Sequence, residues 1–480
     1  MSDNHNMDKD AYIKQLEAEN AQLKQRIETL EKRLEEMEKH IENLERRWGM
    51  NSKNSSKPPS SDPPGMAVAL PRHRRKKRGA RHGHQPHLRA LLPESMVKQW
   101  FHLKPQVCLC GGTSLEKTGE EPLRHQVVDI PPIVPEVIEY VQPLYRCRDC
   151  GALVYQPLPE GVKRKHFGPG VLAVVAALTG VLNTSKRKAL AMINEVFSVP
   201  MSLGGLSHCE AQLTEVMDSP YQQAVEHVRR QQVAHADETG WRRGKRQKGW
   251  LWALACAGAA VFMVHPERGQ HAARKLLGMF GGVLVSDRWG GYNLFGGTRQ
   301  ICWAHLQRDF QALNEATGQM GRIGRQLHSL AKQILKRRAR VRDGTLLWRT
   351  FQHRMLPLLR RVESLLEKGA SGHGALRGKC RRILKHREHL WTFVGDQNVE
   401  PTNNAAERVV RQAVLWRKGS FGTQSERGAR YVERILTLCA TCRLQGRSII
   451  EYLRQACRCH VDGIPAPSLI KTAPCLAQTA

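Results

Sequence analysis

Three carboxylates in the second half of the chain have the types and positions that divalent cations require. Asp237 and Asp287 each follow a short apolar run that predicts a β-strand, at residues 232–237 and 283–286, and Glu407 lies at the start of a predicted helix. Phosphodiester cleavage with two divalent ions needs hard oxygen ligands that hold the metals about 3.5–4 Å apart. Mg²⁺ keeps several waters and accepts few protein carboxylates. We therefore predict that Asp237, Asp287 and Glu407 are catalytic and bind Mg²⁺ or Mn²⁺.

Each acid also has a purely structural interpretation. Asp is common where a strand enters a turn, which would account for Asp237 and Asp287. Glu407 lies three residues after Asn404, which is the spacing of a capping box. Glu238, next to Asp237, carries the same charge. Spacing alone leaves these interpretations open.

The elements that must position the acids follow the order of a ribonuclease-H-like domain. Three strands, a helix and one or two further strands are predicted in turn, at residues 232–237, 250–256, 261–264, 271–280, 283–286 and 300–305. In that arrangement the first and fourth strands are neighbours in the sheet. Asp237 and Asp287 would then lie side by side.

The stretch between Asp287 and Glu407 is too long for a loop and predicts an all-helical insertion. Its apolar residues recur at helical spacing: Ile323, Leu327, Leu330, Ile334, Met355, Leu358, Val362 and Leu365. A basic face among them either contacts DNA backbone or is simply solvated: Arg337, Arg338, Arg340 and Arg342.

Basic side chains near the acids and earlier in the chain are candidates to bind phosphates. Those near the acids are His305, Arg308, Arg408 and Arg411. A run without acids at residues 72–81 adds Arg74, Arg75, Lys76, Lys77 and Arg78. The alternatives are a disordered solubilising arm for the run and, for His305, a buried polar residue at a strand end. A net charge of +31 favours a polyanionic partner.

Four cysteines predict a structural zinc site. They form two close pairs, Cys108-x-Cys110 and Cys147-x-x-Cys150, and Gly151 would let the chain turn tightly around a metal. His102 or His125 could replace one thiolate. The alternative is a metal-free β module. Another close pair, Cys439 and Cys442, lies in an apolar helix and is interpreted as core.

The N-terminal segment predicts a coiled coil that pairs two copies of the chain. Its seam alternates three- and four-residue steps: Ile13, Leu16, Asn20, Leu23, Ile27, Leu30, Leu34, Met37, Ile41, Leu44 and Trp48. β-branched residues at a, Leu at d and one polar Asn20 favour a parallel homodimer. The alternative is one amphipathic helix docked on its own domain.

Residues 167–217 predict three helices with a tight turn at residues 198–202. Ser185 is a plausible N-cap of the second. This geometry is compatible with a helix-turn-helix and equally with a small helical bundle.

Composition excludes several classes of protein. The chain has 480 residues, with no apolar run long enough to span a bilayer and no signal-peptide pattern at its N-terminus. We therefore expect a cytoplasmic protein without a membrane partner, in which close cysteine pairs indicate metal before disulfide.

Several strings together resemble the insertion-sequence-66 family of transposases. NSSKPPSSD, at Asn54–Asp62, is similar to the linker of that family, and YRCRDCG to its zinc-binding module. HADETGWR, VSDRWGGY and CWAHLQRDF resemble the blocks around the first two acids, and PTNNAAERVVR followed by RKGSFGTQSERGA resembles the block that carries the third. The resemblance implies a DDE transposase with Asp237, Asp287 and Glu407 as its acids, and accessory proteins encoded by the same element as further partners.

The predicted fold class is multidomain α+β, with a coiled coil, a zinc-ribbon-like β module, a helical domain and a ribonuclease-H-like α/β core with a helical insertion. The predicted boundaries are 10–48 for the coiled coil, 49–90 for the linker and basic arm, 91–160 for the zinc-finger-like module, 165–225 for the helical DNA-binding domain, 230–310 for the first part of the core, 311–398 for the insertion, 399–430 for the third-acid helix and 431–480 for the C-terminal helices and tail.

The predicted function is binding of double-stranded DNA at transposon ends, followed by metal-dependent cleavage and joining to a target. Two rivals remain. One is a nuclease of the same fold that never joins DNA, and the other is a non-enzymatic, zinc-containing DNA-binding regulator.

Overall fold

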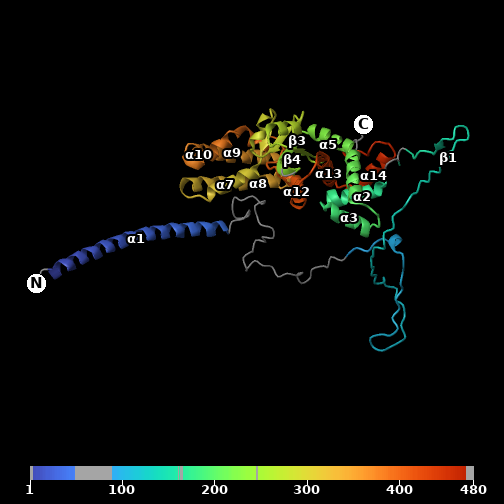
Figure 1. The fold of residues 1–480 in the computed structure, drawn as a ribbon, viewed down its shortest axis with the longest axis horizontal. Helices are drawn as coiled ribbons and strands as arrows, with labels where there is room; N and C mark the ends of the chain where they lie inside the picture. Colours follow the sequence, from blue (N-terminus) through green and yellow to red (C-terminus); the bar gives the residue numbers. More distant parts are fainter. Residues whose placement is uncertain (1–3, 49–88, 160–161, 163–165, 245–246, 472–480) are drawn as a thin grey trace.

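The computed structural model describes residues 4–48, 89–159, 162, 166–244 and 247–471. A helical and sheet-containing body holds residues 166–471, while α1 (Asn4–Trp48) extends away from it (Figure 1). The predicted basic arm, with Arg74, Arg75, Lys76, Lys77 and Arg78, lies outside the described residues. The chain is therefore of the α+β class, as predicted.

A five-stranded mixed sheet forms the centre of the body. Its members are β3 (Val233–Arg243), β4 (Gln247–Ala255), β5 (Ala260–His265), β6 (Val283–Ser286) and β7 (Arg299–Ile301). Their order across the sheet is β5-β4-β3-β6-β7. The antiparallel pairs are β3–β4 and β4–β5, and β6 runs parallel to both β3 and β7. The first and fourth strands are thus neighbours, as the sequence predicted.

Two strand predictions were wrong in their limits. The first strand does not end at Asp237 but continues to Arg243, because β4 pairs with it along that length. The predicted strand at 300–305 stops at Ile301, and Trp303 already begins α7 (Trp303–Asn314). His305 therefore lies in the first turn of a helix and not at a strand end.

Helices that lie before, between and after the strands in the sequence share one continuous hydrophobic core with this sheet. These are α2 (Pro169–Ala176), η4 (Ala177–Val181), α3 (Lys186–Glu195), α4 (Leu203–Val216), α5 (Asp218–Arg229), α6 (Gln270–Leu277), α12 (Asn404–Ser420), α13 (Glu426–Leu444) and α14 (Ile449–Val461). As predicted, Ser185 accepts a hydrogen bond from the Lys188 backbone at the start of α3. Cys439 and Cys442 are buried, as predicted from their apolar helix.

Helix α13 covers the outer edge of β5. The Thr437 and Thr441 hydroxyls accept hydrogen bonds from the Phe262 and Ala260 backbone amides at 3.0 and 3.2 Å. A strand edge otherwise leaves unpaired backbone groups that favour association with other chains. These side chains therefore close one edge of the sheet.

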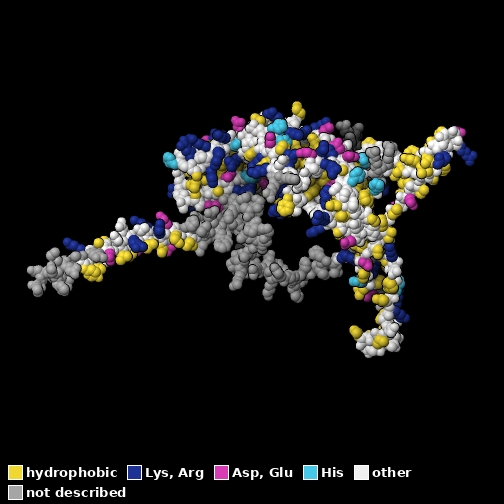
Figure 2. All heavy atoms as spheres, in the orientation of Figure 1, with side chains coloured by type: hydrophobic (Ala, Val, Ile, Leu, Met, Phe, Trp, Pro, Cys, Tyr) yellow, Lys and Arg dark blue, Asp and Glu magenta, His cyan; other side chains and the backbone are white. Residues whose placement is uncertain are grey.

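The insertion that follows α7 forms a second hydrophobic core together with that helix. Its helices are α8 (Gly318–Arg342), α9 (Trp348–Ala370), α10 (Gly374–Leu384), η6 (Arg387–His389) and α11 (Thr392–Gly395). Lys and Arg side chains gather over the α9–α10 part on the face in Figure 2. Arg338 does not belong to the basic face that was predicted, because it is buried and donates to the Gln397 carbonyl and to Glu400.

The N-terminal helix and the cysteine-containing segment bury little surface in the single chain. The described apolar seam of α1 is exposed, with Leu34 at 61% and Met37 at 63%. The segment at 89–159 has one short hairpin, β1 (Tyr145–Arg146) with β2 (Leu153–Val154). Apolar side chains gather on this hairpin in Figure 2, and others are visible along α1. The seam residues whose side chains are described, from Ile13 to Ile41, are therefore exposed and not docked on the rest of the chain.

Candidate catalytic centre

Strand register places Asp237 and Asp287 at the same level of the sheet. His235 of β3 pairs with Val285 of β6 in parallel, and each acid lies two residues beyond its strand's member of that pair. Because side chains alternate along a strand, equal offsets put both on the same face. The fourth strand ends at Ser286, directly before Asp287, whose carboxylate accepts a hydrogen bond from the Trp289 amide at 2.9 Å.

Glu407 reaches the same region from the first turn of α12. The capping-box interpretation was wrong, because the N-cap is Asn403, not Asn404, and makes no side-chain cap. The side-chain amide of Asn403 instead donates a hydrogen bond of 2.7 Å to the backbone carbonyl of Ala236, the residue before Asp237. This bond holds the start of α12 against β3, and the Glu407 Oε1 atom is buried without a hydrogen-bond partner.

The electrostatics of the cluster call for a cation. Burial raises the pKa of Asp237 to about 8, and the carboxylates of Glu238, Asp287 and Glu407 add to the rise. Among the described residues, no Lys or Arg forms an ion pair with any of the three predicted acids. Several carboxylates without a compensating charge are the donor set that Mg²⁺ prefers, so the residues present fit the predicted ion.

Glu238 differs from its neighbour because its charge is already satisfied. Its side chain is 2% exposed and receives hydrogen bonds from Arg268 at 2.8 Å and from the Tyr292 hydroxyl at 2.7 Å. The Arg268 guanidinium in turn lies over the rings of Trp250 and Trp289. Glu238 therefore supports the loop after β6, whereas Asp237 has no ion pair with a Lys or Arg among the described residues.

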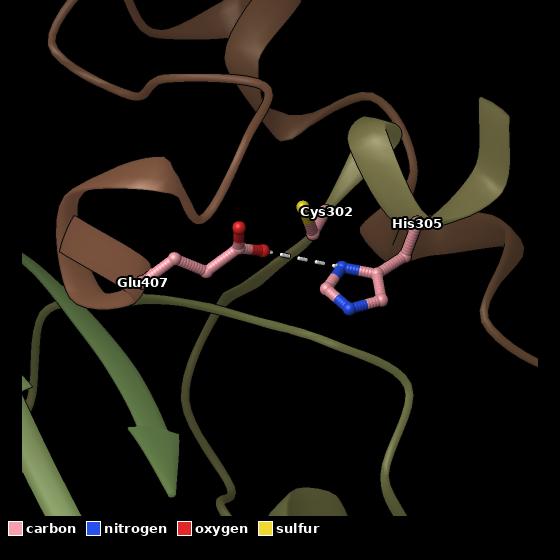
Figure 3. A group of neighbouring side chains, drawn as sticks. All are labelled: Cys302, His305 and Glu407. Carbon is pink, nitrogen blue, oxygen red and sulfur yellow. Dashed lines mark ion pairs between the residues drawn. The ribbon is translucent and has the colours of Figure 1, made fainter. Parts of the chain in front are cut away.

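A cysteine and a histidine at the start of α7 face Glu407 (Figure 3). His305 Nδ1 lies 3.7 Å from Glu407 Oε1, and Cys302 is the N-cap residue of the same helix. Burial lowers the pKa of His305, so its imidazole is neutral at neutral pH. Sequence reasoning gave Cys302 no role, since a strand over 300–305 would have placed it and His305 on opposite faces.

The other predicted phosphate-binding residues that the structure describes are on α7 and α12, the helices that carry His305 and Glu407. Arg308 is half-buried one turn after His305, and Arg408 and Arg411 are exposed on α12. Sequence reasoning also missed Arg299 of β7, which is 2% exposed and donates to the backbone carbonyl of Asp287. It lies directly before the strand predicted at 300–305, and nothing in the local sequence marks it as buried.

Each cysteine pair of the predicted zinc module lies on a tight turn. The Cys108 amide donates to Gly112, the Cys147 amide donates to Ala152, and Gly151 has a positive φ of 73°. Backbone hydrogen bonds lower the pKa values of Cys110 and Cys147, which favours thiolate. These turns suit zinc. Among described residues, however, the group of three metal-binding side chains within 4.8 Å is Cys302, His305 and Glu407, so the two pairs are not brought together.

Comparison with known proteins adds relatives of the chain from one bacterium. Protein y4hP of Sinorhizobium fredii, itself uncharacterized, is 27% identical over 71% of this chain and 68% of its own length. The uncharacterized proteins y4qI and y4jD of the same organism are 27% and 21% identical. The matches cover 51% of both y4qI and this chain, and 80% of y4jD with 79% of this chain.

Three family descriptions match successive parts of the sequence. Residues 5–90 match a family of unknown function, DUF6444, and residues 105–151 match the zinc-finger binding domain of transposase IS66. Among the described residues, no helix has the length and apolar character of a membrane span. Residues 164–431, more than half of the chain and including all three predicted acids, match the transposase IS66 family. The chain therefore belongs to the IS66 family of transposases.

Proposed function

We propose that this transposase cleaves DNA at the ends of its element and joins the freed ends to target DNA, with Asp237, Asp287 and Glu407 as its catalytic acids. The observation that carries the proposal is the convergence of these three carboxylates from β3, β6 and α12, with the pKa of Asp237 raised to about 8. Mixed-sheet order and the parallel β3–β6 pair support a ribonuclease-H-like core.

In this proposal the three carboxylates hold Mg²⁺ or Mn²⁺, which supplies activation of the attacking oxygen and stabilisation of the leaving oxygen. The residues of the chain orient the reacting groups. Arg299 and the Trp289 amide fix the Asp287 segment, and Asn403 fixes the helix of Glu407. Water attacks first and leaves a 3′-OH, and that 3′-OH then attacks the target phosphodiester without a covalent enzyme intermediate.

Basic side chains near the acids would bind the DNA backbone. Arg408 and Arg411 are exposed on the helix of Glu407, and Arg308 lies one turn from the partly exposed His305. In this proposal these three arginines and His305 bind a phosphate near the acids. The basic arm at 72–81 would add contacts outside the described residues. The proposed transposase has the domain boundaries that were predicted from its sequence.

Two further features support the holding of DNA ends. The exposed seam of α1 favours a parallel homodimer, which would keep two ends together. The segment at 89–159 exposes most of its apolar side chains and has no packed core of its own, so binding of Zn²⁺ by Cys108, Cys110, Cys147 and Cys150 would supply its folding energy.

The test is a cleavage and strand-transfer assay on labelled DNA that carries the ends of the element, with Mg²⁺, comparing wild type with Asp237→Asn. Joined product that the variant loses would support the transposase and its first acid. Cleavage without joining would favour the nuclease, and full activity of Asp237→Asn would refute the assignment of the acid. Tight DNA binding with neither product, even after the other proteins of the element are added, would favour the regulator.

A further inference from the structure

Cys302, His305 and Glu407 form a compact set of three different ligand types. One ligand atom from each lies within 4.8 Å of the other two, and the side chains point toward a common space in Figure 3. Cys302 is the N-cap residue of α7 and His305 is the third residue of the helix, positions whose side chains lie close together at a helix start. Glu407 approaches from α12 opposite them.

The burial of the three side chains suits entry of an ion from solvent. Cys302 is fully buried, and its sulfur accepts a hydrogen bond of 3.1 Å from the backbone amide of Asn403. The side chains of His305 and Glu407 are 34% and 38% exposed, so solvent reaches the group from their side. His305 Nδ1 and Glu407 Oε1 are nevertheless buried atoms without hydrogen-bond partners, so a ligand at these atoms would displace no hydrogen bond.

The ligand set is that of a thiophilic cation. Sulfur, imidazole nitrogen and one carboxylate oxygen suit Zn²⁺, whereas Mg²⁺ takes oxygen ligands. A tetrahedral Zn²⁺ holds its N and O ligands about 3.3 Å apart by its bond lengths. The observed distance from His305 Nδ1 to Glu407 Oε1 is 3.7 Å. Small side-chain rotations would therefore complete a site with three protein ligands and one open position.

We propose that Cys302, His305 and Glu407 bind a divalent cation of the Zn²⁺ class, and that this ion competes with Mg²⁺ for Glu407. On binding, the thiol of Cys302 releases its proton to solvent and the thiolate coordinates the ion. The competition rests on the proposed function, in which Glu407 is a Mg²⁺ ligand. An ion held by all three residues withdraws that carboxylate, so Zn²⁺ inhibits cleavage.

Binding is tested first, without any measurement of activity. Co²⁺ replaces Zn²⁺ in the full chain, and its thiolate charge-transfer absorption is compared between wild type, Cys302→Ser and Cys380→Ser. Cys380 is a matched control, since it is equally buried but lies in the insertion, and burial raises the pKa of either thiol to about 11. The four cysteines of the zinc module contribute equally to every spectrum.

We expect Cys302→Ser to bind one Co²⁺ fewer than wild type and to lose the matching absorption, while Cys380→Ser retains both. His305→Gln, a change at a partly exposed side chain, should weaken the same Co²⁺ site. Loss of one ligand should raise its dissociation constant at least about 100-fold, because loss of an outer partner alone costs roughly 10–100-fold. Identical spectra and stoichiometry in wild type and Cys302→Ser would overturn the proposal.

Competition is tested second, as the ratio of Mg²⁺-dependent cleavage with and without added Zn²⁺ within each protein. We expect Zn²⁺ to inhibit wild type and Cys380→Ser at concentrations that leave the ratio for Cys302→Ser near one. A Cys302-dependent Co²⁺ signal without this difference would overturn the competition. Asp237→Asn should lose cleavage and keep the Co²⁺ signal, so a failure of the proposed function is distinguishable from a failure of the ion site.

Discussion

Asn403 is the residue whose loss should separate the helix of Glu407 from the strand of Asp237. The last residue pair between β3 and β6 is His235 with Val285. The carbonyl of the next residue in β3, Ala236, accepts a hydrogen bond of 2.7 Å from the side-chain amide of Asn403. Asn403 is 1% exposed, so water cannot replace this donor. The start of α12 is therefore tied to β3 by a buried hydrogen bond.

We expect Asn403→Ala to cost about 1–3 kcal/mol in local stability, the penalty for a buried group left without its partner. Asn403→Asp should cost more, because an ionised carboxylate cannot donate and would face the carbonyl oxygen of Ala236. Asn404 is exposed and provides the control, for which Asn404→Ala should stay within about 0.5 kcal/mol. A shift of Glu407 by about 1 Å would lower cleavage about 100-fold.

Hydrogen exchange of peptides that cover the start of α12 measures this local opening directly. A loss of 1–3 kcal/mol corresponds to roughly 5- to 150-fold faster exchange in Asn403→Ala, with no change in Asn404→Ala. The cleavage assay supplies the second measurement. Equal exchange and equal cleavage in the two alanine variants would refute the view that Asn403 positions Glu407.

Two further predictions concern stability. Burial raises the pKa of Glu433 from 4.5 to about 7, so the native state loses stability as pH rises from 4.5 to 7. Glu433→Gln keeps an acceptor for the Val264 amide. Its free energy of unfolding should match that of wild type near pH 4 and exceed it by up to about 3 kcal/mol at pH 8. Denaturation at both pH values measures this difference, and a difference that does not change with pH would contradict the prediction. Gly422→Ala should cost at least about 2 kcal/mol, because φ is +110° and the added Cβ would lie 2.2 Å from the Arg242 carbonyl oxygen. Gly419→Ala, in open space within α12, should change stability by less than about 1 kcal/mol, and similar thermal midpoints for the two variants would contradict the steric argument.

Local patterns in the sequence located many of the elements that carry the acids. Residues 283–286 form a strand with the predicted limits, directly before Asp287, and Glu407 lies in the first turn of a helix. Alternation of apolar residues and turn residues operates within one segment, so it needs no knowledge of the rest of the chain. The neighbouring positions of the first and fourth strands also followed from element order alone.

Contacts between distant segments set the limits of strands and helices that local patterns did not predict. Asp237 lies within β3 because β4 continues alongside it, and no local signal marks where a paired strand must stop. Cys302 and His305 lie close together because α7 begins at Trp303, which makes Cys302 its N-cap residue. The Cys302 sulfur accepts a hydrogen bond from the backbone amide of Asn403, the residue before α12. A period of two would have separated these side chains, whereas the helical period brings them together.

Sequence patterns were enough to propose three candidate acids and to predict the strands and the helix that carry them. The packed chain was needed to distinguish an acid that is ion-paired from an adjacent acid that is not. Glu238 and Asp237 are adjacent in the sequence and carry the same charge, yet Arg268 and Tyr292 bind the first, and no described Lys or Arg forms an ion pair with the second. The reason is that satisfaction of a buried charge depends on partners distant in sequence, which only the packed chain brings together.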